Sequence, residues 1–174
     1  MLVDPTCEAR PFEVMKITVG RTKQVLVLSP LLGLKIHFIQ SSRICAGNIC
    51  PACAVGLAGK FQGYLCVLYE GNRWLLRLTS KTGMVGTDAG LFVPGTVLQV
   101  SKPREKRPLV IECETTLKTF DREAILSRVE LLSVVARLHG LPGIVPGMSF
   151  EEGVESVSSC AVECMRLALA AAKR

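Results

Sequence analysis

The pattern of apolar and polar residues predicts a chain built mostly of β-strands. Short runs rich in apolar and β-branched residues are separated by turn residues such as Gly, Asn and Pro, as in antiparallel sheets. The clearest hairpin turns at residues 70–72, and a second one turns at the basic segment 102–108. The predicted strands cover residues 12–19, 24–28, 34–38, 61–69, 73–79, 95–101 and 109–114.

Two segments leave alternatives open. Residues 80–94, rich in Gly and Thr, predict a loop or a short helix. Residues 121–139 fit either a helix throughout or a strand near 124–129 followed by a short helix. That helix would end at His139-Gly140, where Gly suits the C-cap.

The C-terminal part predicts a separate helix. Residues 141–148 hold prolines and glycines outside any periodic pattern, which predicts a linker. Ser149 and Glu152 form a capping box, and small apolar residues then recur at helical spacing. We therefore expect a β-domain over residues 1–140, a linker over 141–148 and a C-terminal α-helix over 149–174.

Residues 37–53, HFIQSSRICAGNICPAC, combine His37 with Cys45, Cys50 and Cys53. Thiolate and imidazole are the ligands that tetrahedral zinc prefers, and Cys50-Pro-Ala-Cys53 is the C-x2-C knuckle of such sites. In the strand predicted at 34–38, alternation turns His37 away from the apolar face. The stretch predicts a closed structural Zn2+ site with four protein ligands, in which Cys66 is the alternative fourth ligand.

These cysteines have two other interpretations. A redox C-x2-C should open a helix after a strand in a thioredoxin-like pattern, which is missing here. The other alternative is a loop that contains cysteines by chance. The chain has eight cysteines, and the clustering of three of them at 45–53, without the pattern of a secretory signal, favours metal binding in a reducing, cytoplasmic compartment.

Composition indicates a globular chain with a basic surface. The 174 residues are 49% hydrophobic and 21% charged, and no apolar run reaches the ~18 residues that span a bilayer, so we expect no membrane partner. The net charge of +6 and the pI near 9.0 suit a polyanion such as nucleic acid. Ordinary surface charge that maintains solubility is the alternative.

Candidate nucleic-acid-binding residues are cations near predicted turns and aromatic rings that could stack on bases. The basic turn, with four cations between Lys102 and Arg107, is the best single candidate. Core packing is the alternative for each ring, and aromatic residues make up only 5% of the chain. The candidates are Arg21, Lys23, Arg43, Lys60, Phe61, Tyr64, Arg73, Trp74, Arg77, Lys102, Arg104, Lys106 and Arg107.

The pattern R-x-C-x4-C-x2-C, from Arg43 to Cys53, precedes the Gly63-Tyr64 strand. With the later strands at 95–100 and 108–112, it resembles bacterial and phage zinc-containing OB-fold proteins that look like single-stranded DNA-binding proteins. The resemblance covers about residues 12–114. It implies an OB-fold and nucleic-acid binding. The chain departs from well-known single-strand binders in its scarce aromatic residues and in lacking an acidic C-terminal tail.

The expected fold class is therefore mostly β (α+β), an OB-fold-like small barrel with a zinc-binding loop and a C-terminal α-helix. The leading functional hypothesis is a non-catalytic protein that binds single-stranded DNA or RNA. The alternative is an interaction module whose zinc loop and C-terminal helix contact a protein partner or a second copy. No recognisable catalytic motif supports an enzyme.

Overall fold

The structure is a computed structural model that describes residues 12–39, 41–45 and 50–138. The predicted linker and C-terminal helix lie outside these residues, so both stay predictions. Within the described part, strands dominate. The strands are β1 (Thr22–Val27), β2 (Leu32–Ile39), β3 (Ser41–Ile44), β4 (Gly59–Tyr69), β5 (Asn72–Thr79), β6 (Thr96–Ser101) and β7 (Val110–Thr116). The helices are α1 (Pro51–Ala54), α2 (Ser80–Asp88), the 3-10 turn η2 (Arg122–Ala124) and α3 (Arg128–Leu138).

The seven strands form one sheet in which every strand pair is antiparallel. Six of them follow the order β3-β2-β4-β1-β6-β7, and β5 pairs with β4. The long strand β4 organises the sheet, because it pairs with β2 near its start, with β1 near its end, and with β5 over most of its length. The two hairpins predicted from the turns at 70–72 and 102–108 are confirmed.

The strands do not close into a barrel. Residues 12–19 were expected to form a strand, but this extended segment makes only isolated parallel bridges, Val14 with Leu75 on β5 and Val19 with Lys102 after β6. Single bridges hold the segment across the gap between β5 and β6 without a continuous ladder of hydrogen bonds. The expected closed OB-type barrel is therefore wrong for the described residues, whereas the mostly β prediction is confirmed.

Both faces of β4 are buried. Tyr64 and Cys66 belong to one apolar cluster, which α3 covers with Leu131 and Val135. Leu65 and Val67 belong to a second cluster on the opposite face, together with Met15 and Ile17 from the extended segment. The alternation of side chains along β4 thus supplies both clusters, and two packed cores stabilise the sheet.

Residues 121–138 contain a turn followed by a helix. The predicted short helix is therefore present, but the strand expected near 124–129 is not, and the predicted helix end at His139-Gly140 lies outside the described residues. η2 covers Arg122–Ala124, and α3 begins at Arg128. The start of α3 is a capping box, in which the Ser127 Oγ accepts from the Glu130 N–H at 3.2 Å and the Glu130 carboxylate accepts from the Ser127 N–H at 2.7 Å. This local pairing ends the preceding extended chain before residue 128.

Across the described ranges, no helix is long and apolar enough to span a membrane.

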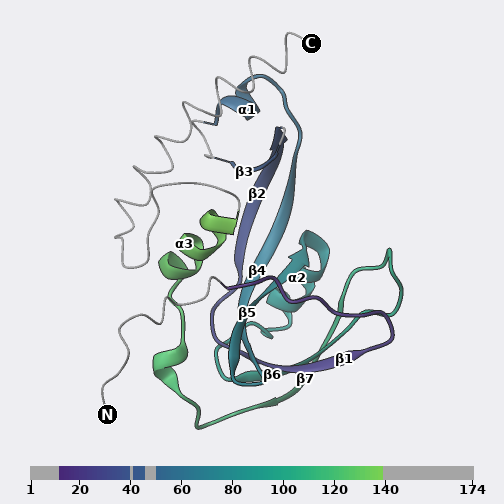
Figure 1. The fold of residues 1–174 in the computed structure, drawn as a ribbon, viewed down its shortest axis with the longest axis vertical. Helices are drawn as coiled ribbons and strands as arrows, with labels where there is room; N and C mark the ends of the chain where they lie inside the picture. Colours follow the sequence, from purple (N-terminus) through teal and green to yellow (C-terminus); the bar gives the residue numbers. More distant parts are fainter. Residues whose placement is uncertain (1–11, 40, 46–49, 139–174) are drawn as a thin grey trace.

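The strands β2 and β4 extend beyond the rest of the sheet as a two-stranded arm, with β3 and α1 at its end (Figure 1). The short strand β3 was not expected from the sequence. It pairs with the last residues of β2, from Ile36 opposite Ile44 to Ile39 opposite Ser41. The cysteine-rich stretch therefore lies at the end of this arm, whereas β1, β6 and β7 lie at its other end.

Candidate metal centre and basic groove

Three elements at the end of the arm bring His37, Cys45, Cys50 and Cys53 together. His37 is on β2, Cys45 directly follows β3, Cys50 precedes α1, and Cys53 lies within it. The backbone N–H of Cys45 donates to the Lys35 carbonyl at 2.8 Å, and the N–H of Ala54 donates to the Cys50 carbonyl at 3.1 Å. These bonds fix the chain on both sides of the cluster.

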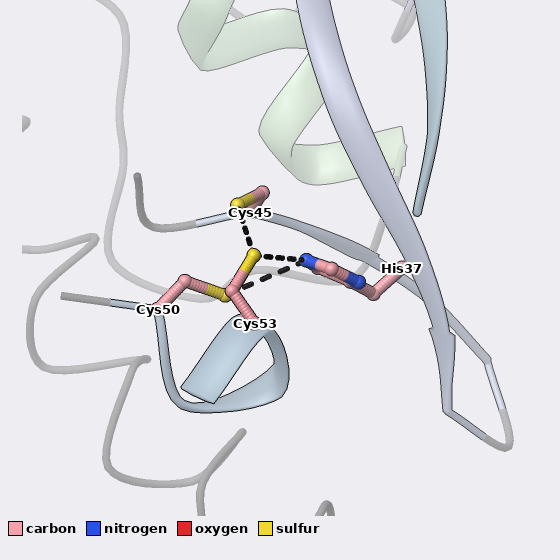
Figure 2. A group of neighbouring side chains, drawn as sticks. All are labelled: His37, Cys45, Cys50 and Cys53. Atoms are coloured by element: carbon pink, nitrogen blue, oxygen red, sulfur yellow. Dashed lines mark hydrogen bonds between the residues drawn. The ribbon is translucent and has the colours of Figure 1, made fainter. Parts of the chain in front are cut away.

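The ligand atoms point toward one another (Figure 2). The His37 Nε2 lies 3.5 Å from the Cys50 Sγ and 3.4 Å from the Cys53 Sγ, and the Cys45 and Cys53 sulfurs lie 3.6 Å apart. In a regular tetrahedron, bonds of about 2.3 Å to sulfur and about 2.0 Å to nitrogen separate two sulfurs by about 3.8 Å and a sulfur from a nitrogen by about 3.5 Å. The four residues therefore form a cluster that could bind a metal ion such as zinc.

A hydrogen bond sets the orientation of the His37 ring. Its Nδ1 lies 3.2 Å from the Ala58 carbonyl oxygen, which can only accept, so Nδ1 carries the proton in this contact. The lone pair is then on Nε2, the atom that faces the sulfurs. Metal-bound histidines usually have such a second partner, because it fixes both the tautomer and the ring orientation.

The side chain of Lys35 neutralises part of the charge of the cluster. Its Nζ donates a hydrogen bond to the Cys53 Sγ at 3.3 Å. This bond, and the negative charge of the cluster sulfurs, raise the pKa of Lys35 and keep the ammonium group protonated. His37 and Cys50 are buried, while Cys45 and Cys53 are partly exposed, so the cluster lies at the surface of the arm.

Cys66, the alternative fourth ligand, is not part of the cluster. It is completely buried in the apolar cluster beneath α3. Burial raises the pKa of its thiol to about 12, which keeps it protonated at neutral pH. His37 is therefore the fourth potential ligand, as the strand alternation indicated.

A groove of about 1080 Å3 lies where the extended segment passes the start of β4, the end of β5 and the turn after β6. Its cations come from four separate parts of the chain, and none of the described residues that line it is acidic. Phe61 also lines the groove and is 62% exposed, so its ring is available to a ligand. The cations are Lys16, Lys60, Arg77, Lys102 and Arg107.

The groove contains Lys60, Phe61, Arg77, Lys102 and Arg107 of the candidates predicted from the sequence. The other candidate cations with described side chains do not line it. Lys23 lies over the Tyr69 ring at 4.7 Å, and Arg73 lies over the Phe12 ring at 4.8 Å. The side chain of Arg43 lies outside the described part of the chain. The remaining cations that do not line the groove are Arg21, Arg104 and Lys106.

Two predicted base-stacking rings pack into the protein instead. Tyr64 is completely buried, so it has no face free for a base, and this prediction is wrong. Its hydroxyl donates to the Gln62 side chain at 3.0 Å, and Arg77 lies opposite it on β5, so Tyr64 supports two groove residues. Trp74 is partly buried and packs against the core cluster that contains Leu65 and Val67.

Sequence reasoning missed Lys16 and Lys35. Lys16 lies between the buried residues Met15 and Ile17, and this alternation is visible in the sequence. Lys35 gives no such signal, because only the pairing of β2 with the cysteine-rich stretch brings its Nζ to Cys53.

No protein-family model, curated protein or solved structure matches this chain, so the resemblance to zinc-containing OB-fold proteins stays a prediction.

Proposed function

We propose that this protein binds single-stranded nucleic acid in the basic groove and that a structural Zn2+ ion, held by His37, Cys45, Cys50 and Cys53, stabilises the neighbouring arm. The observation that supports binding is the groove itself. Five cations and an exposed phenylalanine share it without any acidic residue among its described lining. Cations attract phosphates, and an aromatic face stacks on any base.

The exposed ring in the groove favours a single strand over a duplex as the ligand. Phe61 can contact a base face only if the base is unstacked, and a duplex keeps its bases stacked inside. The cations that line the groove with this ring, among them Lys60 and Lys102, would bind the phosphates that flank such a base. Backbone and stacking contacts of this kind carry little sequence preference.

The proposed metal is structural because the site supplies four protein ligands. Three thiolates and one imidazole complete a tetrahedral shell, which leaves no position for a catalytic water. Three thiolates with a neutral imidazole leave one net negative charge on a Zn2+ centre, which the ammonium of Lys35 offsets. The proposed role is accordingly non-catalytic.

Fluorescence anisotropy of a labelled oligothymidylate, at increasing salt, tests the binding. If all five groove cations contact phosphates, log K should fall against log salt with a slope of about −3.5. At this slope, affinity would drop about 100-fold between 50 and 200 mM salt. The absence of binding at low salt would overturn the proposal. A duplex of the same length is the control, and it should bind more weakly.

A further inference from the structure

The cluster of His37, Cys45, Cys50 and Cys53 is fastened to the two strands of the arm. The Cys45 N–H bonds to the Lys35 carbonyl on β2, and the His37 ring bonds to the carbonyl of Ala58, directly before β4. His37 also lies opposite Gly59, the first residue of β4. Any change in the cluster therefore acts directly on the position where β2 and β4 meet.

Among the described residues, the segment from Cys45 to Leu57 has almost no apolar core of its own. Its buried residues are Cys50 and Ala52, and the partly buried side chains packed on them are Cys45, Cys53 and Leu57, whereas the neighbouring Ile36 and Ile44 belong to the main cluster beneath α3. The helix α1 is one turn of four residues, too short to be stable without outside contacts. Three of these five packed residues are the cysteine ligands, so a bound ion would be the main force that orders the segment.

The paired strands β2 and β4 connect the cluster to the groove, because residues of β4 line it. From the His37–Gly59 pair, the next residues in register are Ile36 opposite Lys60 and Lys35 opposite Phe61. Lys60 and Phe61 line the groove, and Lys35 also donates to the Cys53 sulfur. The metal centre and the groove residues are thus consecutive positions of one antiparallel ladder.

The rest of the groove does not depend on the cluster. Arg77, Lys102 and Arg107 lie on β5 or near the β6–β7 turn, and the apolar cluster with Leu65, Val67 and Leu98 supports these strands. Neither of the two main apolar clusters contains His37, Cys45, Cys50 or Cys53. Loss of the ion should consequently loosen Lys60 and Phe61 while the remaining groove cations stay in place.

We propose that metal occupancy controls nucleic-acid affinity, an inference that rests on the proposed binding function. With Zn2+ bound, the end of the arm is ordered, and the β2–β4 ladder holds Lys60 and Phe61 in the groove. Without the ion, the ladder frays from Gly59 toward Gln62, while both main clusters keep the rest of the sheet folded. The regulating ligand is a tetrahedral, thiolate-binding divalent cation, for which Zn2+ is the probe.

The test compares the full chain loaded with Zn2+ and the same chain stripped by a chelator under reducing conditions. We expect the stripped protein to bind labelled oligothymidylate about 10-fold more weakly or worse, since a stacking contact and one phosphate contact are lost. Re-addition of Zn2+ should restore the affinity. Fluorescence of Trp74, the chain's single tryptophan, should change little, and amide hydrogen exchange should accelerate at residues 59–62.

A pair of cysteine variants repeats the test without a chelator. Cys50→Ser removes a potential ligand and should bind oligothymidylate as weakly as the stripped protein. Cys113→Ser alters an exposed cysteine on β7 and should behave as the parent does.

Each outcome separates this inference from the binding function. If the loaded protein does not bind, both proposals are overturned. If the loaded and stripped proteins bind equally well, binding stands and metal control is overturned. If the stripped protein loses its Trp74 signal and its cooperative melting together with its affinity, the ion supports the whole fold, and the inference of a separately ordered arm is overturned.

Discussion

His37 on β2 lies directly opposite Gly59 on β4, and its ring occupies space that a side chain at position 59 would need. A Cβ at position 59 would lie 3.1 Å from the His37 Cε1, 2.9 Å from the Lys35 Cγ and 2.7 Å from the Lys35 Cε. The absence of a side chain at position 59 therefore permits two contacts. The His37 Nε2 can approach the cysteine sulfurs, and the Lys35 ammonium can donate to the Cys53 sulfur.

Gly59→Ala should consequently weaken Zn2+ binding by about 10-fold, within the range for changes in residues that support metal ligands. The methyl group should displace the Lys35 side chain from Cys53 and shift the His37 ring by a few tenths of an ångström. Competition with a chromogenic zinc chelator measures the affinity. Gly33→Ala on the partner strand β2 is the control, because a Cβ there meets nothing within 4 Å. Equal zinc affinity in both variants would contradict this role of Gly59.

The basic turn after β6 allows a charge-matched test of the groove. Lys102 and Arg107 line the groove, whereas Arg104 and Lys106 do not, although all four lie within six residues. Reversing Lys102 and Arg107 to Glu should lower the salt slope from about −3.5 to about −2, since two phosphate contacts are lost. Reversing Arg104 and Lys106 changes the net charge equally and should leave the slope near its original value. If the two double variants behave alike, the turn acts through net charge and not through the groove.

Phe61 and Phe38 form a second matched pair. Both rings are largely exposed, at 62% and 78%, but only Phe61 lines the groove. Loss of a base-stacking ring costs about 1–3 kcal/mol, so Phe61→Ala should weaken oligothymidylate binding by about 5- to 150-fold. Phe38→Ala should have little effect. Anisotropy at one fixed salt concentration measures both, and an unchanged affinity in Phe61→Ala would remove stacking from the proposal.

The buried thiol of Cys66 should make stability fall at alkaline pH. Its pKa is raised from 9.0 to about 12 in the folded protein, so between these values the unfolded chain loses a proton that the folded chain keeps. Stability from this group is complete below about pH 9 and declines as pH rises through the folded pKa, by about 2 kcal/mol near pH 10.5. Denaturant unfolding of Cys66→Ala should decline less steeply over this range. Parallel pH profiles for the parent and the variant would contradict the assignment.

The hairpins and the cysteine knuckle could be predicted because their signals are local. Gly and Asn at 70–72 define the turn of β4–β5, and strand alternation places His37 away from Ile36 and Phe38. The spacing of Cys50 and Cys53 likewise limits how far their sulfurs can separate. A capping box at Ser127 and Glu130 was also available and would have located the start of α3.

Contacts between residues distant in the sequence decided the rest. Tyr64 and Phe61 are both aromatic residues on β4, but Tyr64 is buried in the cluster beneath α3, whereas Phe61 on the other face belongs to neither cluster and stays exposed. Lys16, Arg77 and Arg107 share a groove because the extended segment crosses from β5 to the end of β6. The sequence by itself determined most of the strands and the three cysteine ligands, since these depend on neighbouring residues. Only the tertiary structure decided which rings are exposed and which cations meet, because strand pairing and burial join residues far apart in the chain.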